Sequence, residues 1–247
     1  MRDEQVISTE QGSRTWMCAD FPVLDYQKAW DLQLDLVAAR KEGRVTDVLL
    51  LVEHPPVFTL GRRGGRENLA VSEEFLKERG IPLTHVERGG NITFHGPGQL
   101  VGYPIIDLHA AKLGITEYVG RLEEVMILTA GHWGVCAGRN SLNRGIWVGN
   151  SKLGSIGIAI RRGISFHGFA FNVNVSLEPF GWINPCGLQG IGITSMERES
   201  SQKLPMNEVR EQLKLNIESV FGIKVVTVEP AMLKAVARER PGCIVLN

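Results

Sequence analysis

Runs of apolar residues separated by glycine and proline divide this chain into alternating strands and helices. The apolar run 48–52 is too short for a buried helix and predicts a central strand, and a second short strand is expected over 57–60. Apolar residues at helical spacing after Asp25 predict an amphipathic surface helix capped by that residue. The same reasoning predicts helices capped by Thr116 and Asn207.

Alternating residues in the second half of the chain predict paired strands. A hairpin is expected over 145–160, and 163–177 alternates as one long strand. That alternation places His167 with Phe169, Phe171 and Val173 on one face, and Gly168 with Ala170, Asn172 and Asn174 on the other. The small residues on the second face permit either an acyl tunnel or tight packing between strands. His167 fits a hydrogen-bonded core ring as well as a catalytic one.

Together these elements predict one α/β domain over 1–247, with a mixed central sheet and flanking helices. Its motif-bearing part covers about 26–195, and 205–247 forms a C-terminal scaffold. Polar residues and sparse apolar spacing leave 197–205 as the one long loop expected to be mobile.

Composition narrows the classes of function. The chain has 247 residues, 43% of them hydrophobic, and its 27 basic and 27 acidic residues cancel, which argues against a dedicated nucleic-acid-binding protein. No apolar run is long enough to cross a membrane, and the acidic N-terminus is unlike a secretory or transit signal, so a cytoplasmic protein is expected. The four cysteines lack C-x-x-C spacing, which leaves buried thiols or a nucleophile rather than a zinc or redox site.

The stretch 88–104, R-G-G-N-I-T-F-H-G-P-G-Q-L-V-G-Y-P, combines glycines with a cation and a histidine. Its glycines allow a ligand to lie against bare backbone. Arg88 and His95 bracket the apolar pair Ile92 and Phe94, so one segment offers a cation, a titratable ring and an apolar wall. We interpret this stretch as a ligand site; the alternative is a glycine-rich hairpin with a surface arginine.

Three further features allow more than one interpretation. The loop 61–66, G-R-R-G-G-R, carries Arg62, Arg63 and Arg66; it lacks P-loop spacing and either contacts an anionic partner or is simply solvated. Lys152 at the start of a strand is typical of a solvated edge residue. Cys186 lies in an N-P-C-G turn, which is how nucleophiles are presented, whereas the other cysteines are expected to be buried.

Four motifs in order resemble those of the lipoyl(octanoyl) transferases. They are R-G-G-x-x-T-x-H-G-P-G-Q-L-V-x-Y-P, K-x-x-S-I-G, H-G-x-A-x-N-V and I-N-P-C-G-L. Members of this family move an octanoyl group from acyl carrier protein to a lysine of lipoyl domains. The resemblance implies a fold similar to the catalytic domain of lipoyl transferases and biotin/lipoyl ligases, with no metal or cofactor. It implies octanoyl-acyl carrier protein as donor, and as acceptors the lipoyl domains of 2-oxoacid dehydrogenase E2 subunits and the glycine cleavage H protein.

The resemblance also implies roles for individual residues. Cys186 would form a thioester acyl-enzyme, and Lys152 would be its partner. The residues implied to contact substrate are Arg88, Gly89, Gly90, Asn91, Ile92, Thr93, Phe94, His95, Ser155, Ile156, Gly157, Gly168, Phe169, Ala170, Tyr26 and His54. Two alternatives stay open: an ATP-dependent lipoate or biotin ligase, against which the turn-borne Cys186 argues, and a non-catalytic module that binds an acyl chain or a carrier protein.

Overall fold

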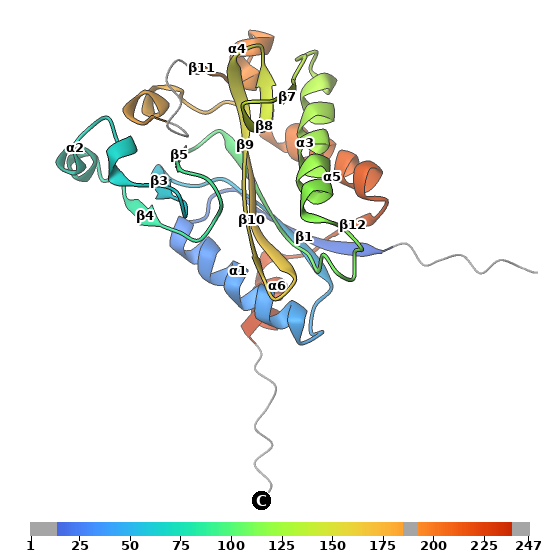
Figure 1. The fold of residues 1–247 in the computed structure, drawn as a ribbon. Coiled ribbons are helices and arrows are strands. Elements are labelled where there is room, and N and C mark those ends of the chain that lie inside the picture. The colour runs from blue at the N-terminus through green and yellow to red at the C-terminus, as the bar shows by residue number, and fades with distance from the viewer. Residues whose placement is uncertain (1–13, 185–191, 239–247) are drawn as a thin grey trace, which may run out of the picture.

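A mixed β-sheet runs through the centre of the molecule (Figure 1). The structure is a computed structural model and describes residues 14–184 and 192–238. The strand order is β12-β1-β2-β6-β10-β9-β8-β7, with β11 paired to β9; β1 is parallel to β2 and β12, whereas β2, β6, β10 and β9 are successively antiparallel. The strands are β1 (Thr15–Phe21), β2 (Asp47–Val52), β6 (Gln99–Ile105), β7 (Gly138–Asn140), β8 (Asn143–Val148), β9 (Ser151–Arg161), β10 (Ile164–Asn172), β11 (Gly192–Ile193) and β12 (Lys224–Thr227).

Helices cover both faces of this sheet, which confirms the predicted architecture. Every residue of β2 is buried; Leu49 and Leu51 face the cluster under α3 and α5, whereas Leu50 faces the cluster under α1 and α6. Burial on both sides explains why this strand reads as an unbroken apolar run. The helices are α1 (Tyr26–Lys41), α3 (Ile115–His132), α4 (Met196–Ser200), α5 (Met206–Phe221) and α6 (Pro230–Arg238). None of the helices in the described ranges is both long and apolar enough to cross a bilayer.

A second, three-stranded sheet lies beside the central one (Figure 1) and contains Ile92–His95 of the glycine-rich stretch, whose residues 99–104 lie in β6 of the central sheet. Its strands are β3 (Val57–Leu60), β4 (Leu83–His85) and β5 (Ile92–His95), in the order β4-β3-β5. The short helix α2 (Glu73–Glu78) and the 3₁₀ turns Arg66–Asn68 and Glu178–Trp182 accompany them. Phe94 lies in the core of this small unit, with its ring centroid 5.1 Å from that of Phe58 and 5.5 Å from that of Phe180.

The predicted helix starts have mixed outcomes. Asp25 caps α1 as expected, since its side chain accepts a hydrogen bond from the Lys28 amide. The other two caps were wrong. Helix α3 already begins at Ile115 after Gly114, and α5 begins after Pro205, with no side-chain cap bond at either residue. Gly114 and Pro205 have extended backbones and directly precede the first turns of α3 and α5. The predicted caps Thr116 and Asn207 therefore lie inside the helices.

One face assignment on β10 was also wrong. His167 has φ of 52°, a left-handed conformation that is rare outside glycine and interrupts the pleat. Its ring contacts Trp30 of α1, Tyr103 and Phe166 instead of sharing a face with Phe169. Gln33 of α1 holds this conformation, since its side-chain oxygen accepts the His167 backbone N–H at 2.7 Å. The buried glutamine therefore explains a break that strand alternation does not predict.

A buried arginine on α5 connects this helix, through Glu53, to the glycine-rich stretch. Arg210, 5% exposed, donates to the Leu51 carbonyl and pairs with Glu53 at 3.1 Å and Asp20 at 3.4 Å. Glu53 in turn accepts the Gly98 backbone N–H at 2.8 Å. One carboxylate thus joins the end of β2, α5 and the turn before β6.

Replacing Arg210 with methionine should lower the free energy of unfolding by about 3 kcal/mol, because Glu53 loses its cation and the Leu51 carbonyl loses its donor, whereas Asp20 keeps its pair with Lys214. The matched control is Arg66→Met, which removes an exposed pair with Glu73 and should cost less than about 1 kcal/mol. Urea unfolding at constant m-value gives both numbers. Equal losses in the two variants would contradict the structural role of Arg210.

Candidate active site

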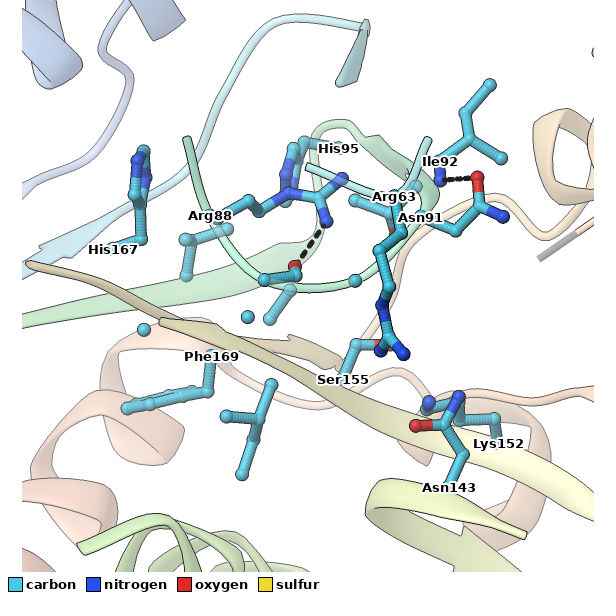
Figure 2. Close-up of a pocket in the computed structure, with 18 of the residues that line it drawn as sticks. Arg63, Arg88, Asn91, Ile92, His95, Asn143, Lys152, Ser155, His167 and Phe169 are labelled. Atoms are coloured by element: carbon cyan, nitrogen blue, oxygen red, sulfur yellow. Dashed lines mark hydrogen bonds between the residues drawn. The ribbon is translucent and has the colours of Figure 1, made fainter. Parts of the chain in front are cut away.

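A cavity of about 380 Å³ lies where β6, β9 and β10 meet the glycine-rich stretch (Figure 2). It is lined by Lys152 and by every residue predicted to contact substrate except His54 and Phe94. The two exceptions lie behind the wall: Phe94 points into the small core described above, and His54 supports Tyr103. Residues from four segments far apart in sequence therefore meet at one site: Tyr26, 88–95, 152–157 and 168–170.

The R-G-G segment lies directly against β9, and bare backbone makes this possible. The Gly89 amide donates to the Ile158 carbonyl at 2.9 Å, and Gly90 has φ of 90°. A Cβ at Gly157 would lie 2.9 Å from the Gly89 oxygen, and one at Gly168 would lie 2.1 Å from the Gly102 oxygen. The small residues thus serve tight backbone packing, one of the two interpretations left open, and they also line the cavity.

Arg88 is built into the wall of the cavity. It is 8% exposed, and its guanidinium donates to the Thr59 carbonyl at 2.7 Å, to the Thr59 hydroxyl at 2.8 Å and to the Gly89 carbonyl at 3.0 Å. These bonds connect β3 to the glycine segment and fix the cation in place. The alternative of a surface arginine on a hairpin is therefore wrong.

Neutral rings form one end of the cavity. His54 Nδ1 lies 2.7 Å from the Leu24 carbonyl and Nε2 lies 2.8 Å from the Tyr103 hydroxyl. Burial lowers the pKa of His54 to about 4, so at neutral pH Nδ1 donates to the carbonyl and Nε2 accepts from Tyr103. Burial, with the charges of His54 and Arg88, lowers the pKa of His95 well below its usual value. His54 therefore orients Tyr103 without lining the cavity itself.

Lys152 lies toward the opposite end, and it is not the solvated edge lysine that its position in sequence suggests. It is 6% exposed, and its Nζ lies 5.1 Å from the centroid of the Trp147 ring. Strand β9 is flanked there on both sides, since Lys152 pairs with Trp147 of β8 and with Ile193 of β11. Figure 2 shows its side chain beside Asn143, which lies at the start of β8. An ammonium placed there strongly affects any neighbouring ionisable group.

Cys186, with the Pro185 and Gly187 that flank it, lies outside the described residues, as does Cys243. The last described residue before this segment is Asn184, whose backbone N–H donates to the Asn68 carbonyl. The first described residue after it is Gly192, which pairs in the sheet with Ser151, the neighbour of Lys152. The other two cysteines differ. Cys18 is buried as predicted, and burial followed by the charge of Asp20 raises its pKa to about 12. Cys136 is exposed, so its predicted burial was wrong.

Several lining residues were not predicted from the sequence. Val101 and Tyr103 belong to the glycine-rich stretch, where the alternation of β6 was a usable signal. Leu142 and Asn143, at the turn into β8, reach the cavity only through tertiary packing and have no local signal. The same holds for Phe180 and Ile193. Of the three arginines in the loop 61–66, Arg63 lines the cavity and Arg66 pairs with Glu73 at 2.8 Å.

The sequence comparisons agree with this geometry. Residues 25–218 match the family model of the lipoyl protein ligase A/B catalytic domain. The octanoyltransferase of Desulfotalea psychrophila is 51% identical over 206 residues, 82% of this chain and 92% of that protein. The octanoyltransferase of Caldicellulosiruptor bescii is 46% identical over 81% of this chain and 88% of that protein. This chain belongs to the octanoyltransferase family. Family membership confirms the resemblance carried by the four motifs and makes the chain an enzyme rather than a non-catalytic binding module.

Solved structures confirm the fold of this octanoyltransferase. A lipoate-protein ligase A bound with ATP superposes with a TM-score of 0.70 at 17% identity, covering 92% of both chains. A bipartite lipoate protein ligase from Thermoplasma acidophilum gives a TM-score of 0.68 at 18% identity, covering 90% of this chain and 91% of that chain. At such identity the likeness concerns the fold alone, which this chain shares with lipoate-protein ligases.

Proposed function

We propose that this enzyme transfers an octanoyl group from octanoyl-acyl carrier protein to a lysine of lipoyl domains through a thioester on Cys186. The observation that carries the proposal is the burial of Lys152 at the cavity, beside the strand where the chain resumes after the cysteine-bearing segment. The names of the curated relatives support the octanoyl group. The acceptors we propose are the lipoyl domains of 2-oxoacid dehydrogenase E2 subunits and the glycine cleavage H protein.

The cavity suits an acyl chain. Ile156, Phe169 and Ala170 line it together with the backbone of Gly89 and Gly90. Its volume of about 380 Å³ falls within the usual range for small-molecule sites. Bare backbone and apolar side chains offer a flexible alkyl chain contact without unpaired polar groups, as burial of an apolar substrate requires.

In the first half of the reaction the Cys186 thiolate attacks the thioester carbonyl of the donor. A new carbon–sulfur bond forms to Cys186, the bond to the carrier's pantetheine sulfur breaks, and the Lys152 ammonium protonates the departing thiolate to a thiol. A positive charge at Lys152 also favours the ionised form of a nearby thiol before attack. Cysteine suits this step because it is both a strong nucleophile and a good leaving group.

In the second half the acceptor lysine attacks the new thioester. Its amine forms the amide bond, loses a proton to the now neutral Lys152, and expels Cys186 as a thiolate. Each half-reaction restores the protonation state that the other needs, so no external acid or base is consumed. Arg62, Arg63 and Arg66 lie in one loop, of which Arg63 lines the cavity, and we expect this loop to provide a cationic contact for an acidic carrier protein.

The deciding experiment incubates the enzyme with octanoyl-acyl carrier protein and an unmodified lipoyl domain, with and without ATP. We expect equal octanoyl transfer in both, and an acyl adduct on the Cys186 peptide when the acceptor is omitted. A ligase would instead need ATP and free octanoate. Transfer that depends on ATP, or the absence of any adduct on Cys186 during turnover, would contradict the proposal.

A further inference from the structure

A buried carboxylate on helix α3 contacts the start of β8. Glu123 is 1% exposed, and its Oε1 accepts the backbone N–H of Gly145 at 2.9 Å. Its other oxygen accepts from Arg139 at 3.2 Å and from Arg144 at 3.4 Å. Two half-exposed guanidinium groups therefore balance the charge of Glu123, while Oε1 bonds to the strand. A buried acceptor paired with a buried amide fixes β8 relative to α3.

Gly145 brings this contact directly against the side chain of Lys152. Its φ of 115° is a conformation that residues with a Cβ rarely adopt. A Cβ at this position would overlap the Gly154 carbonyl oxygen and would lie 3.0 Å from Lys152 Cε. The terminal methylene of the lysine therefore lies against the backbone that Glu123 holds.

The pairing of β8 with β9 is irregular at the same place. Ile146 pairs with Gly154, whereas the next residue, Trp147, pairs with Lys152, so Leu153 is an extra residue on β9. Bulges of this kind redirect side chains and are common next to active sites. The Lys152 Nζ lies 5.1 Å from the centroid of the Trp147 ring. The backbone of β8 and one of its side chains thus both bound the lysine.

We propose that Glu123 is a positioning residue that holds Lys152 at the cavity through the backbone of Gly145. The inference rests on the proposed function for the role of Lys152. It assigns a part in catalysis to a carboxylate that is not among the described residues lining the cavity, and that acts through β8 rather than on the substrate. A displacement of about 1 Å in a catalytic group lowers a rate by as much as about a hundredfold, so a contact that sets the place of β8 also sets the rate.

The test separates the hydrogen bond of Glu123 from its charge. Glu123→Leu removes the acceptor of the Gly145 N–H, whereas Glu123→Gln keeps a carbonyl oxygen for that N–H and loses only the charge. With octanoyl-acyl carrier protein as donor, we expect kcat to fall about ten- to a hundredfold in Glu123→Leu while KM stays close to that of the parent. Glu123→Gln should restore most of the rate. A fall of equal size in both variants would overturn the inference, because it would assign the effect to the charge.

Glu218→Leu is the matched control. Glu218 Oε1 accepts the Val225 N–H at 2.8 Å, so it makes the same kind of bond from a helix to a strand. Val225 lies in β12, which is at the far end of the strand order from β8. We expect the parent's kcat in this variant, and an equal fall in both leucine variants would show a general loss of stability instead. Circular dichroism establishes folding. If Glu123→Leu does not fold, Glu123→Asp decides, because it keeps the charge but is one methylene shorter toward the Gly145 amide.

A second measurement reads the position of Lys152 without any turnover. The Trp147 ring lies close enough to shift the NMR signals of the terminal methylene protons of the lysine, and comparison with Lys152→Met assigns these signals. We expect the shift to be lost in Glu123→Leu and kept in Glu123→Gln and Glu218→Leu. An unchanged Lys152 signal in folded Glu123→Leu would contradict the positioning role, whereas absent transfer by the parent enzyme would contradict only the proposed function.

Discussion

Replacing Cys186 with serine is expected to reduce octanoyl transfer by more than about a thousandfold, because it removes the group that forms the covalent intermediate. A few per cent of an ordinary cysteine is ionised at neutral pH, whereas a serine hydroxyl is almost entirely protonated. An oxoester on serine would also be a poorer acyl donor to the acceptor amine. The rate of octanoylation of a lipoyl domain, with intact-mass analysis of the enzyme, gives the measurement.

Cys136→Ser is the control for this substitution. Cys136 is exposed and does not line the cavity, so its replacement should leave the rate of transfer unchanged. The midpoint of urea unfolding of Cys186→Ser should equal that of the parent enzyme. A loss of activity in this variant then reflects the missing thiol and not an unfolded protein. Transfer by Cys186→Ser at close to the parent rate would rule out the acyl-enzyme and require direct attack by the acceptor lysine on the carrier thioester.

Elements whose burial is local could be predicted from the sequence. Strand β2 is buried on both faces and therefore reads as an unbroken apolar run, and the cap at Asp25 depends only on a contact three residues away. The hairpin of β8 and β9 follows from its turn at Gly149, which has φ of 54°. The cap and the turn are fixed by contacts within their own segments. Strand β2 is buried along its whole length, so all of its residues are apolar apart from Asp47 at its start.

Features set by distant contacts could not be predicted. The left-handed backbone at His167 depends on Gln33, which is 134 residues away in sequence. Helical spacing places Gln33 between Ala29 and Val37 on the inward side of α1, but its polar side chain gives no signal of the contact that it makes with β10. Faces are assigned from the pattern of apolar residues, and a polar residue that faces inward departs from that pattern. The sequence pattern therefore does not predict the contact between Gln33 and His167.

In the candidate site too, residues within one continuous segment were predicted, whereas features that depend on distant strands were not. The segment 88–95 is continuous, and the structure places most of it at the cavity. Phe94 is the exception within it, because its ring belongs to the core formed with Phe58 and Phe180. The burial of Lys152 arises from pairing with β8 on one side and β11 on the other, contacts that spacing alone does not reveal.

The effect of replacing Lys152 with methionine should be almost as large as that of removing the thiol. Methionine keeps much of the length and apolar contact of lysine but removes the charge and the transferable proton. We expect acyl-enzyme formation to slow by about 10² to 10⁴, the usual worth of a positioned acid or base. The pH profile for alkylation of Cys186 should also move upward, toward the value near 8.5 of an ordinary thiol. Iodoacetamide labelling followed by peptide mapping provides this profile, with the exposed Lys203→Met as control.

Lys152→Arg separates the two roles of the lysine. A guanidinium keeps the positive charge beside the thiol, so the alkylation profile of Cys186 should stay close to that of the parent. It does not release its proton at any ordinary pH, so it cannot accept one from the attacking amine. Lys152→Arg should therefore retain a reactive thiolate yet fail in overall transfer, and acyl-enzyme should accumulate if the departing thiol can take its proton from water. Coincident alkylation profiles for the parent and Lys152→Met would show instead that another group activates the sulfur, and full transfer by Lys152→Arg would exclude proton exchange at this position.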